Sequence, residues 1–273
     1  MKVFLSVDME GICGVVGEKE TDPENGGDAY RANCHRMTAE ANAAIQGCLK
    51  AGAAEILVAD SHWNFDNLIP EDLDPAATLM RGCPRPYSMV QDLDGSFEAI
   101  LCVGYHAMAG TPRAIIDHTF TGRIRTVEVN GRVVGETGLN AYVAGEFGVP
   151  IVLVTGDTAV TAEAQALLRG VHTVAVKEAI NTHAAKHLHP QRACDLIRGE
   201  AEKAVRGAAE IEPLVASRPV AMAIDFKGTE AADRAELVPT VTRVGGTRVE
   251  FSAPDFLQAF RAFYACMHMS SPE

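Results

Sequence analysis

Short apolar runs alternate with longer stretches of helical spacing over the first part of the chain. The runs predict strands, because they are only a few residues long and rich in Val, Ile and Leu. They lie at residues 2–8, 55–60 and 99–104. Between the first two runs, apolar residues from about Met37 to Ala51 recur at helical spacing, and Gly52 is a typical helix stop. This alternation predicts a mostly parallel sheet flanked by helices.

A hairpin and a further strand are predicted next along the chain. Residues 125–134 predict the hairpin, because Asn130-Gly131 at their centre is a strong turn signal. A predicted helix at about 138–147 then leads into the apolar run IVLVTGD. Since that run is continuous and apolar, it predicts a strand buried on both faces.

Toward the C-terminus, helices and strands no longer alternate regularly. Helical spacing occurs at residues 159–169, 190–209 and 254–266, and extended runs occur at 172–179, 219–226, 238–243 and 247–252. We therefore expect an α/β fold, with a mostly parallel sheet in the N-terminal part and a smaller α+β C-terminal part. The predicted domains are residues 1–170, an α/β domain, and residues 171–273, an α+β domain, with a boundary somewhere in 157–175.

Composition and charge narrow the classes of partner. The formal net charge is -12, from 36 acidic and 24 basic residues, and the chain has no long run of Lys or Arg, which argues against a nucleic-acid partner. No apolar stretch approaches the ~18 residues of a membrane span, and Asp8 and Glu10 come too early for a signal peptide. The seven cysteines are scattered without a CxxC pair, which favours a reducing cytoplasm.

Carboxylates and histidines follow the predicted strands of the first part. Chemistry in open α/β sheets collects at the carboxyl ends of the strands. Asp8 and Glu10 follow the first strand, His62 the second and His106 the third, while Glu136 follows the hairpin. We therefore expect these five side chains to face one opening of the fold.

Three carboxylates and two imidazoles form a donor set that suits Zn²⁺, Mn²⁺ or Co²⁺ better than Ca²⁺. Five ligands are too many for one four-coordinate metal with a water position, but a carboxylate can bridge two ions. Asp8 is the most central candidate for that bridge, and two ions would share a hydroxide. The alternative is that Asp8 and Glu10 lie in a solvated turn and that His62 and His106 are ordinary surface or core histidines.

Four motifs resemble one family in their order and separation. They are SVDMEG, DSH, GYHA and GETGLNAYVAGEFGVPIVLVTGD, and the similarity continues through AVKEAIN over nearly the whole chain. The chain is therefore similar to the M55 metallopeptidases, the D-aminopeptidases of bacterial dipeptide-transport operons. The resemblance implies two zinc ions per chain, with Asp8 bridging. Glu10 and His62 would complete one zinc site, and His106 and Glu136 the other.

The resemblance also implies an activity and an assembly. The expected function is zinc-dependent hydrolysis of short peptides or amides with N-terminal D-amino acids, such as D-Ala, by a bridging-hydroxide dizinc mechanism. The expected assembly is a homodecamer of two stacked pentameric rings. Alternatives are a metal-dependent amidase acting on another peptide or a cell-wall fragment, and a metal-free protein whose acidic cluster binds a cationic small molecule.

His118 occupies the family's catalytic histidine position and is the predicted acid or base, since an imidazole titrates near neutrality. The sequence departs from the family just before it. Arg113 and Ala114 stand where the family has a single Gly, and Asp117 stands where it has a small residue. The pocket shape and substrate preference could therefore differ. The alternative is that His118 is only an exposed loop histidine.

Two further residues are predicted to support the site. Asp60 could accept the second ring proton of His62, as metal-bound histidines usually require, or could cap the following turn. Asn140 could donate to a substrate carbonyl or be only structural.

Two competing sites have weaker support. His183 and His187 would share one face if their segment were helical, with His189 nearby, but no Glu of an HExxH pattern accompanies them. We expect these histidines to form a solvated or interface cluster. The GVVG segment at 14–17 lacks the full dinucleotide fingerprint.

Overall fold

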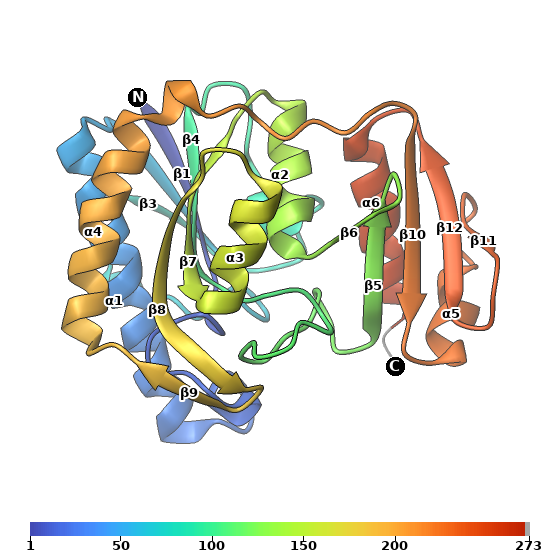
Figure 1. Cartoon of the computed structure of the whole chain (residues 1–273), viewed down its shortest axis with the longest axis horizontal. Helices are drawn as coiled ribbons and strands as arrows, with labels where there is room; N and C mark the ends of the chain where they lie inside the picture. Colours follow the sequence, from blue (N-terminus) through green and yellow to red (C-terminus); the bar gives the residue numbers. More distant parts are fainter. Residues whose placement is uncertain (271–273) are drawn as a thin grey trace.

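Two β-sheets organise the chain, and helices pack against both of them (Figure 1). The computed structural model describes residues 1–270. The larger sheet has seven strands in the order β3-β2-β1-β4-β7-β8-β9, and the smaller has five in the order β11-β12-β10-β5-β6. The predicted fold class, a mostly parallel sheet flanked by helices with further α+β structure, is confirmed.

The strands of the larger sheet run parallel, except that β9 pairs antiparallel to β8. They are β1 (Lys2–Val7), β2 (Glu55–Asp60), β3 (Thr78–Met80), β4 (Ala99–Tyr105), β7 (Ile151–Asp157), β8 (His172–Asn181) and β9 (Ala184–His187). The central strands β1, β4 and β7 are almost entirely buried, as continuous apolar runs in a parallel sheet require.

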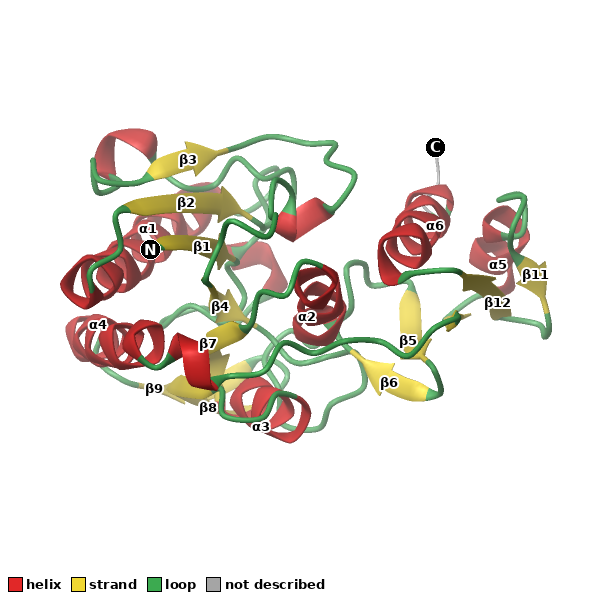
Figure 2. Cartoon of the chain, turned by 90° about the horizontal axis from the view of Figure 1, so that it is seen from above, coloured by secondary structure: helices red, strands yellow, loops and turns green. Residues whose placement is uncertain are grey.

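Helices cover both faces of this sheet (Figure 2). One face carries α1 (Gly27–Ala51) and α4 (Pro190–Arg206), and the other carries α2 (Glu136–Glu146) and α3 (Thr158–Leu167). Successive side chains of β1 enter the cores on the two faces in turn, because neighbouring residues of a strand point to opposite faces. Val3, Leu5 and Val7 join the core under α1 and α4, whereas Phe4 joins the core on the opposite face.

The smaller sheet is antiparallel and is covered on one face by two helices. Its strands are β5 (Ile124–Val129), β6 (Arg132–Val134), β10 (Val220–Phe226), β11 (Thr242–Arg243) and β12 (Arg248–Ala253). The helices are α5 (Thr229–Ala235) and α6 (Phe256–Met269). Phe256, Phe260 and Phe263 of α6 are fully buried in the same core as residues of α2 and β4. The two sheets therefore share one continuous apolar core.

Sheet membership does not follow chain order. The β5–β6 hairpin, which lies before residue 170, pairs with β10 of the smaller sheet. Conversely β8, β9 and α4, which follow residue 170, complete the larger sheet and its helical cover. The predicted division into two domains, residues 1–170 and 171–273, stays a prediction.

Local structure differs from expectation in several places. Helix α1 begins at Gly27, ten residues before the expected start. The strand expected at 238–243 is reduced to Thr242–Arg243, since Pro239 lacks a backbone donor, and the short helix α5 precedes it. The segment with His183 and His187 contains strand β9 rather than a helix, so the shared helical face does not exist. Single-turn 3₁₀ helices occur at Glu18–Glu20, Pro70–Asp72, Ser88–Val90 and Ala208–Glu210.

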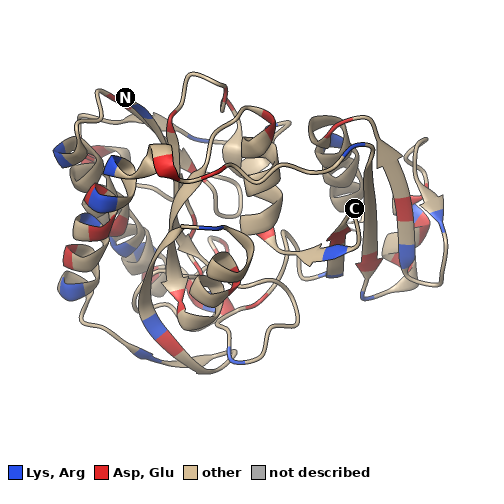
Figure 3. Cartoon of the chain, turned by 45° about the horizontal axis from the view of Figure 1, so that its top comes forward, with Lys and Arg blue, Asp and Glu red and all other residues tan. Residues whose placement is uncertain are grey.

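Charged residues are mixed on the outer helices rather than sorted by sign (Figure 3). None of the helices in residues 1–270 combines the length and apolar character that a membrane span requires. All seven cysteines are free thiols; Cys83 is exposed, Cys194 is half-buried and the other five are buried.

Candidate metal centre

Three neighbouring strands bring the predicted site residues together. The neighbouring strands β2, β1 and β4 run parallel, so their carboxyl ends lie side by side. The residues that follow the three strands therefore converge. The backbone N–H of Asp8 donates to Val103 of β4 at 2.8 Å, and that of Ser61 donates to Val7 of β1 at 2.8 Å. The parallel pairing thus continues one residue past each strand, which fixes Asp8 between His62 and His106.

The loop after Asp8 packs directly on the end of β4. The N–H of Gly11 donates to the carbonyl of Gly104 at 2.7 Å. A Cβ on Gly11 would lie 2.0 Å from the Tyr105 carbonyl oxygen, which no side chain can accommodate. Gly104 has φ of +73°, a conformation that favours glycine. Both glycines therefore let the loop that carries Asp8 and Glu10 lie close to β4.

The two carboxylate oxygens of Asp8 face different imidazoles. Oδ1 lies 3.3 Å from Nδ1 of His62, and Oδ2 lies 3.6 Å from Nε2 of His106. Glu10 Oε2 lies 3.0 Å from the same nitrogen of His62, and Glu136 Oε1 lies 3.2 Å from the same nitrogen of His106. Asp8 thus stands between one pair, Glu10 with His62, and a second pair, His106 with Glu136.

Each imidazole uses one ring nitrogen on a backbone carbonyl. His62 Nε2 donates to Thr21 at 2.8 Å, His106 Nδ1 to Ala107 at 3.0 Å, and His118 Nδ1 to Ile116 at 2.8 Å. A carbonyl oxygen can only accept, so in the neutral rings the other nitrogen carries a lone pair. Those lone pairs face the carboxylates, an arrangement that repels unless a cation or protons lie between them.

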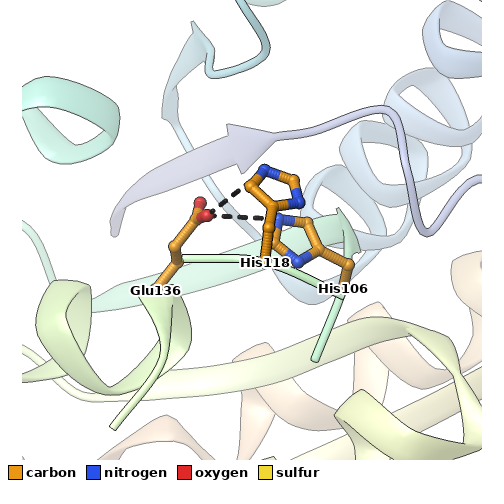
Figure 4. Close-up of side chains that lie close together, drawn as sticks. All are labelled: His106, His118 and Glu136. Carbon is orange, nitrogen blue, oxygen red and sulfur yellow. Dashed lines mark ion pairs between the residues drawn. The ribbon is translucent and has the colours of Figure 1, made fainter. Parts of the chain in front are cut away.

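His118 lies beside this cluster and at its exposed side. Its ring stacks on that of His106, with centroids 4.0 Å apart and an interplanar angle of 14°. Its Nε2 lies 3.8 Å from Glu136 Oε1, and Figure 4 shows both rings turned toward that carboxylate. The side chain of His118 is 22% exposed, against 5% for Glu136. Among these three residues, His118 is therefore the one open to solvent and substrate.

Burial and mutual charge perturb every titrating group of the cluster. Burial and the nearby Glu10 raise the pKa of Asp8. Burial alone would raise the pKa of Glu10, but the nearby His62 lowers it. Burial alone would lower the pKa of His106, but the nearby Glu136 raises it. Burial and then the charge of His106 lower the pKa of His118, which favours its neutral form. Without a cation, protons must balance the carboxylates.

The donor set fits a divalent metal of the zinc type. Two groups have ligand atoms within 4.8 Å of one another: Asp8, Glu10 and His106, and also His106, His118 and Glu136. Buried carboxylates with imidazole lone pairs directed at them are N/O ligands of the kind that Zn²⁺ takes. The carbonyls that accept from the second ring nitrogens are the partners that metal-bound histidines usually have.

The predicted supporting residues lie near the cluster but make other contacts. Asp60 accepts from the backbone N–H groups of Asn67 and Leu68, both at 2.6 Å, and so holds the following turn. It does not reach the ring of His62, whose second nitrogen donates to Thr21. Asn140 is fully buried, and its amide donates to the Tyr105 hydroxyl at 2.9 Å.

The three histidines near β9 do not converge. His187 Nδ1 accepts from the N–H of Gly14 at 3.0 Å, and His189 caps α4 by accepting from the N–H of Gln191 at 3.2 Å. His183 is exposed on the turn before β9. His187 and His189 therefore have local roles, and no shared ligand position is seen among the three histidines in residues 1–270.

Lys177 was not predicted and is central to the loop after β1. Its ammonium donates to the carbonyl oxygens of Glu10, Ile12 and Val15, the last two at 2.9 and 2.8 Å. The residue is 3% exposed, and burial lowers its pKa to about 8. The available signal was a single lysine inside the apolar run HTVAVKEAIN of β8. A buried lysine must find acceptors, which here are the carbonyls of that loop.

A cleft of about 740 Å³ opens over the cluster. Asp8, Glu10, His62, His118 and Glu136 are among the residues that line it. The rest of the lining combines the loops after β1 and β2 with residues from the second half of the chain, including Lys227 and Met267. The volume is that of a small-molecule or short-peptide site.

Comparisons with known proteins cover almost the entire chain. A family model described as Peptidase_M55, D-aminopeptidase, matches residues 1–265. A D-aminopeptidase of Bacillus subtilis (strain 168) is 40% identical over 264 residues, which are 96% of this chain and 95% of the relative. A solved structure described as Zn-dependent D-aminopeptidase DppA from Bacillus subtilis, a self-compartmentalizing protease, has a TM-score of 0.95 and 37% identity, covering 99% of this chain and 98% of that one.

Proposed function

Because this chain belongs to the M55 D-aminopeptidase family and is a peptidase, we propose that it is a zinc-dependent aminopeptidase. Its substrates would be short peptides or amides with an N-terminal D-amino acid such as D-Ala. One observation carries the proposal: Asp8 lies between two carboxylate and imidazole pairs, with one oxygen toward each. The relatives named D-aminopeptidase and described as Zn-dependent support it.

Two zinc ions per chain would be held by five side chains, those of Asp8, Glu10, His62, His106 and Glu136. Asp8 would serve both ions, with Glu10 and His62 completing one site and His106 and Glu136 the other. The lone pairs of His62 Nδ1 and His106 Nε2, which face the carboxylates, support this assignment. When bound, the metal ions acidify water and polarise the scissile carbonyl.

His118 would move the proton that amide hydrolysis requires. Its Nδ1–H is held by the Ile116 carbonyl, so Nε2 is the atom free to accept or donate. This nitrogen lies 3.8 Å from Glu136 Oε1, and His118 lines the cleft. The lowered pKa of His118 favours a neutral ring, which can accept a proton and then pass it to the leaving amine.

We also propose that the chain acts as a homo-oligomer, a decamer of two pentameric rings. The support is the structural relative's description as a self-compartmentalizing protease, together with its 98% coverage by this chain. In such an assembly, access to the cleft would be restricted to short peptides.

Hydrolysis of D-Ala and L-Ala amides by the zinc-loaded protein tests the proposal. Faster release of amine from the D-amide, lost on chelation and restored by zinc, is the expected result. Preference for the L-amide, or activity only on cell-wall fragments, would favour the other amidases considered above. If the protein neither hydrolyses an amide nor binds metal, the result would favour the alternative of a metal-free binding protein.

A further inference from the structure

The single tryptophan of the chain stands at the cleft, next to a proposed zinc ligand. Trp63 follows His62 directly, and their ring centroids lie 6.3 Å apart. The residue is 51% exposed and lines the same cleft as Asp8, His118 and Glu136. An indole left half in water in this cleft offers a large apolar surface for a bound ligand to cover.

The backbone at Trp63 is strained. Its φ is +51°, a left-handed conformation that is rare for a bulky residue. The turn is closed by a hydrogen bond from the N–H of Phe65 to the carbonyl of His62 at 2.8 Å. Glycine would occupy the first central position of such a turn with less strain. Strain of this kind concentrates at ligand-binding sites, where the surrounding structure holds it in place.

The surrounding contacts hold this turn firmly. The Asn67 side-chain amide donates to the carbonyl of His62 at 2.6 Å, and the Tyr30 hydroxyl donates to Asn67 Oδ1 at 2.8 Å. The guanidinium of Arg85 lies 4.6 Å from the centre of the Phe65 ring, and its Nη1 donates to the Asp60 carbonyl at 3.0 Å. The indole is therefore presented on a fixed support rather than on a loose loop.

The cleft around Trp63 is lined by both charged and apolar side chains. The charged side chains include carboxylates and imidazoles of the cluster together with Lys19 and Lys227. The apolar ones include Ile116, Phe120 and Met267. We propose that Trp63 forms one wall of a subsite that binds an apolar or aromatic side chain of the peptide substrate. This proposal rests on the proposed function. The substrate class would then extend beyond D-Ala to D-amino acids with larger apolar side chains.

Substrate selectivity tests the subsite. The measured quantity is the ratio of kcat/KM for the amide of D-Phe to that for the amide of D-Ala. In Trp63→Ala this ratio should fall roughly 10-fold, mainly through KM, because a lost apolar contact changes discrimination by about that factor. Trp63→Phe should restore most of it. Leu237→Ala, a change at a residue that is 67% exposed and outside the cleft, should leave the ratio unchanged.

Fluorescence gives a second readout that does not need turnover. Since Trp63 is the only tryptophan, its emission reports on this position alone. Adding D-Phe to the zinc-loaded protein should shift the emission saturably, with a weaker response to D-Ala. Trp63→Phe should abolish the signal.

Three results would overturn the subsite. These are an unchanged selectivity ratio in Trp63→Ala, an emission that does not respond to D-Phe, and dissociation of the oligomer by Trp63→Ala with the ratio unchanged. The last would show that a second copy of the chain covers the indole. If the unmodified protein hydrolyses neither amide, the proposed function fails, while the fluorescence titration still decides the subsite.

Discussion

Lys177 donates from its buried ammonium to the main-chain carbonyl of Glu10, across 167 residues of sequence. The same ammonium also binds the carbonyls of Ile12 and Val15. All three of its protons are therefore used on the loop that carries a proposed zinc ligand. The contact joins β8 to the carboxyl end of β1 and makes Lys177 a positioning residue for the cluster.

Replacing Lys177 by Met should weaken zinc binding. The methionine keeps the apolar stem but leaves three carbonyls without their donor, so the loop can relax and shift Glu10. Supporting residues of metal sites typically contribute about 10- to 100-fold in affinity, and we expect a loss in that range. Titration with a competing zinc chelator measures it. Lys186→Met, at an exposed position of β9 that pairs with Glu178, is the matched control. Equal zinc affinity in the two variants would show that Lys177 does not position the site.

Replacing His118 by Ala should separate metal binding from turnover. We expect kcat to fall by roughly 10² or more, the usual contribution of general acid or base catalysis. Zinc content should be unchanged, because the proposed ligands remain. Metal analysis and amide hydrolysis on the same sample provide both values. His183→Ala, at an exposed histidine outside the cleft, should retain full activity. A His118→Ala protein with a normal rate would exclude His118 from the reaction.

Two glycine-to-alanine changes should have opposite effects on stability. Gly11→Ala places a Cβ 2.0 Å from the Tyr105 carbonyl, so the loop must move and the free energy of unfolding should fall by several kcal/mol. Gly199→Ala lies in helix α4, where no atom approaches the new Cβ within 4 Å. It should raise the free energy of unfolding by roughly 0.5–1 kcal/mol through helix propensity. Urea unfolding of the two variants checks both signs. A stable Gly11→Ala protein would contradict the close packing of this loop on β4.

An ion pair on the smaller sheet should make stability depend on pH in the acidic range. Glu128 of β5 receives two hydrogen bonds from Arg248 of β12, at 2.7 and 3.0 Å, and these lower its pKa. The pair should contribute under about 1 kcal/mol, because it is partly exposed. A lowered carboxyl pKa means that this contribution is present above the unfolded pKa of about 4.3 and is lost as the pH falls through the folded value.

Urea unfolding of Glu128→Gln between pH 7 and pH 3 checks this sign. The variant should be less stable than the unmodified protein at pH 7, and the difference should shrink toward pH 3. Glu212→Gln, an exposed carboxylate with no ion pair in the described part of the chain, should show no such difference. A stability difference that grows as the pH falls would contradict the assignment.

Local pattern was sufficient to predict the strands that carry the site. β1, β2 and β4 are short apolar runs, and each is followed within a few residues by an Asp or a His. Parallel pairing of these strands then makes the convergence of Asp8, His62 and His106 a consequence of topology. The family and the peptidase activity were likewise predicted from the motifs, and both are confirmed.

Contacts distant in sequence could not be predicted in the same way. Nothing near His62 indicates that its ring donates to Thr21, which lies 41 residues earlier, and nothing near Lys177 indicates its carbonyl partners. The placement of the β5–β6 hairpin in the smaller sheet depends on pairing with β10, almost a hundred positions later in the numbering. Such pairings depend on the folded arrangement of the whole chain rather than on local periodicity.

The central claim is that Asp8 serves two metal ions at once, and zinc analysis of dialysed protein tests it most directly. We expect two zinc ions per chain in the unmodified protein and, in Asp8→Ala, the loss of both ions together with turnover. An Asp8→Ala protein that keeps both zinc ions, or unmodified protein that holds none after exposure to zinc, would contradict the account.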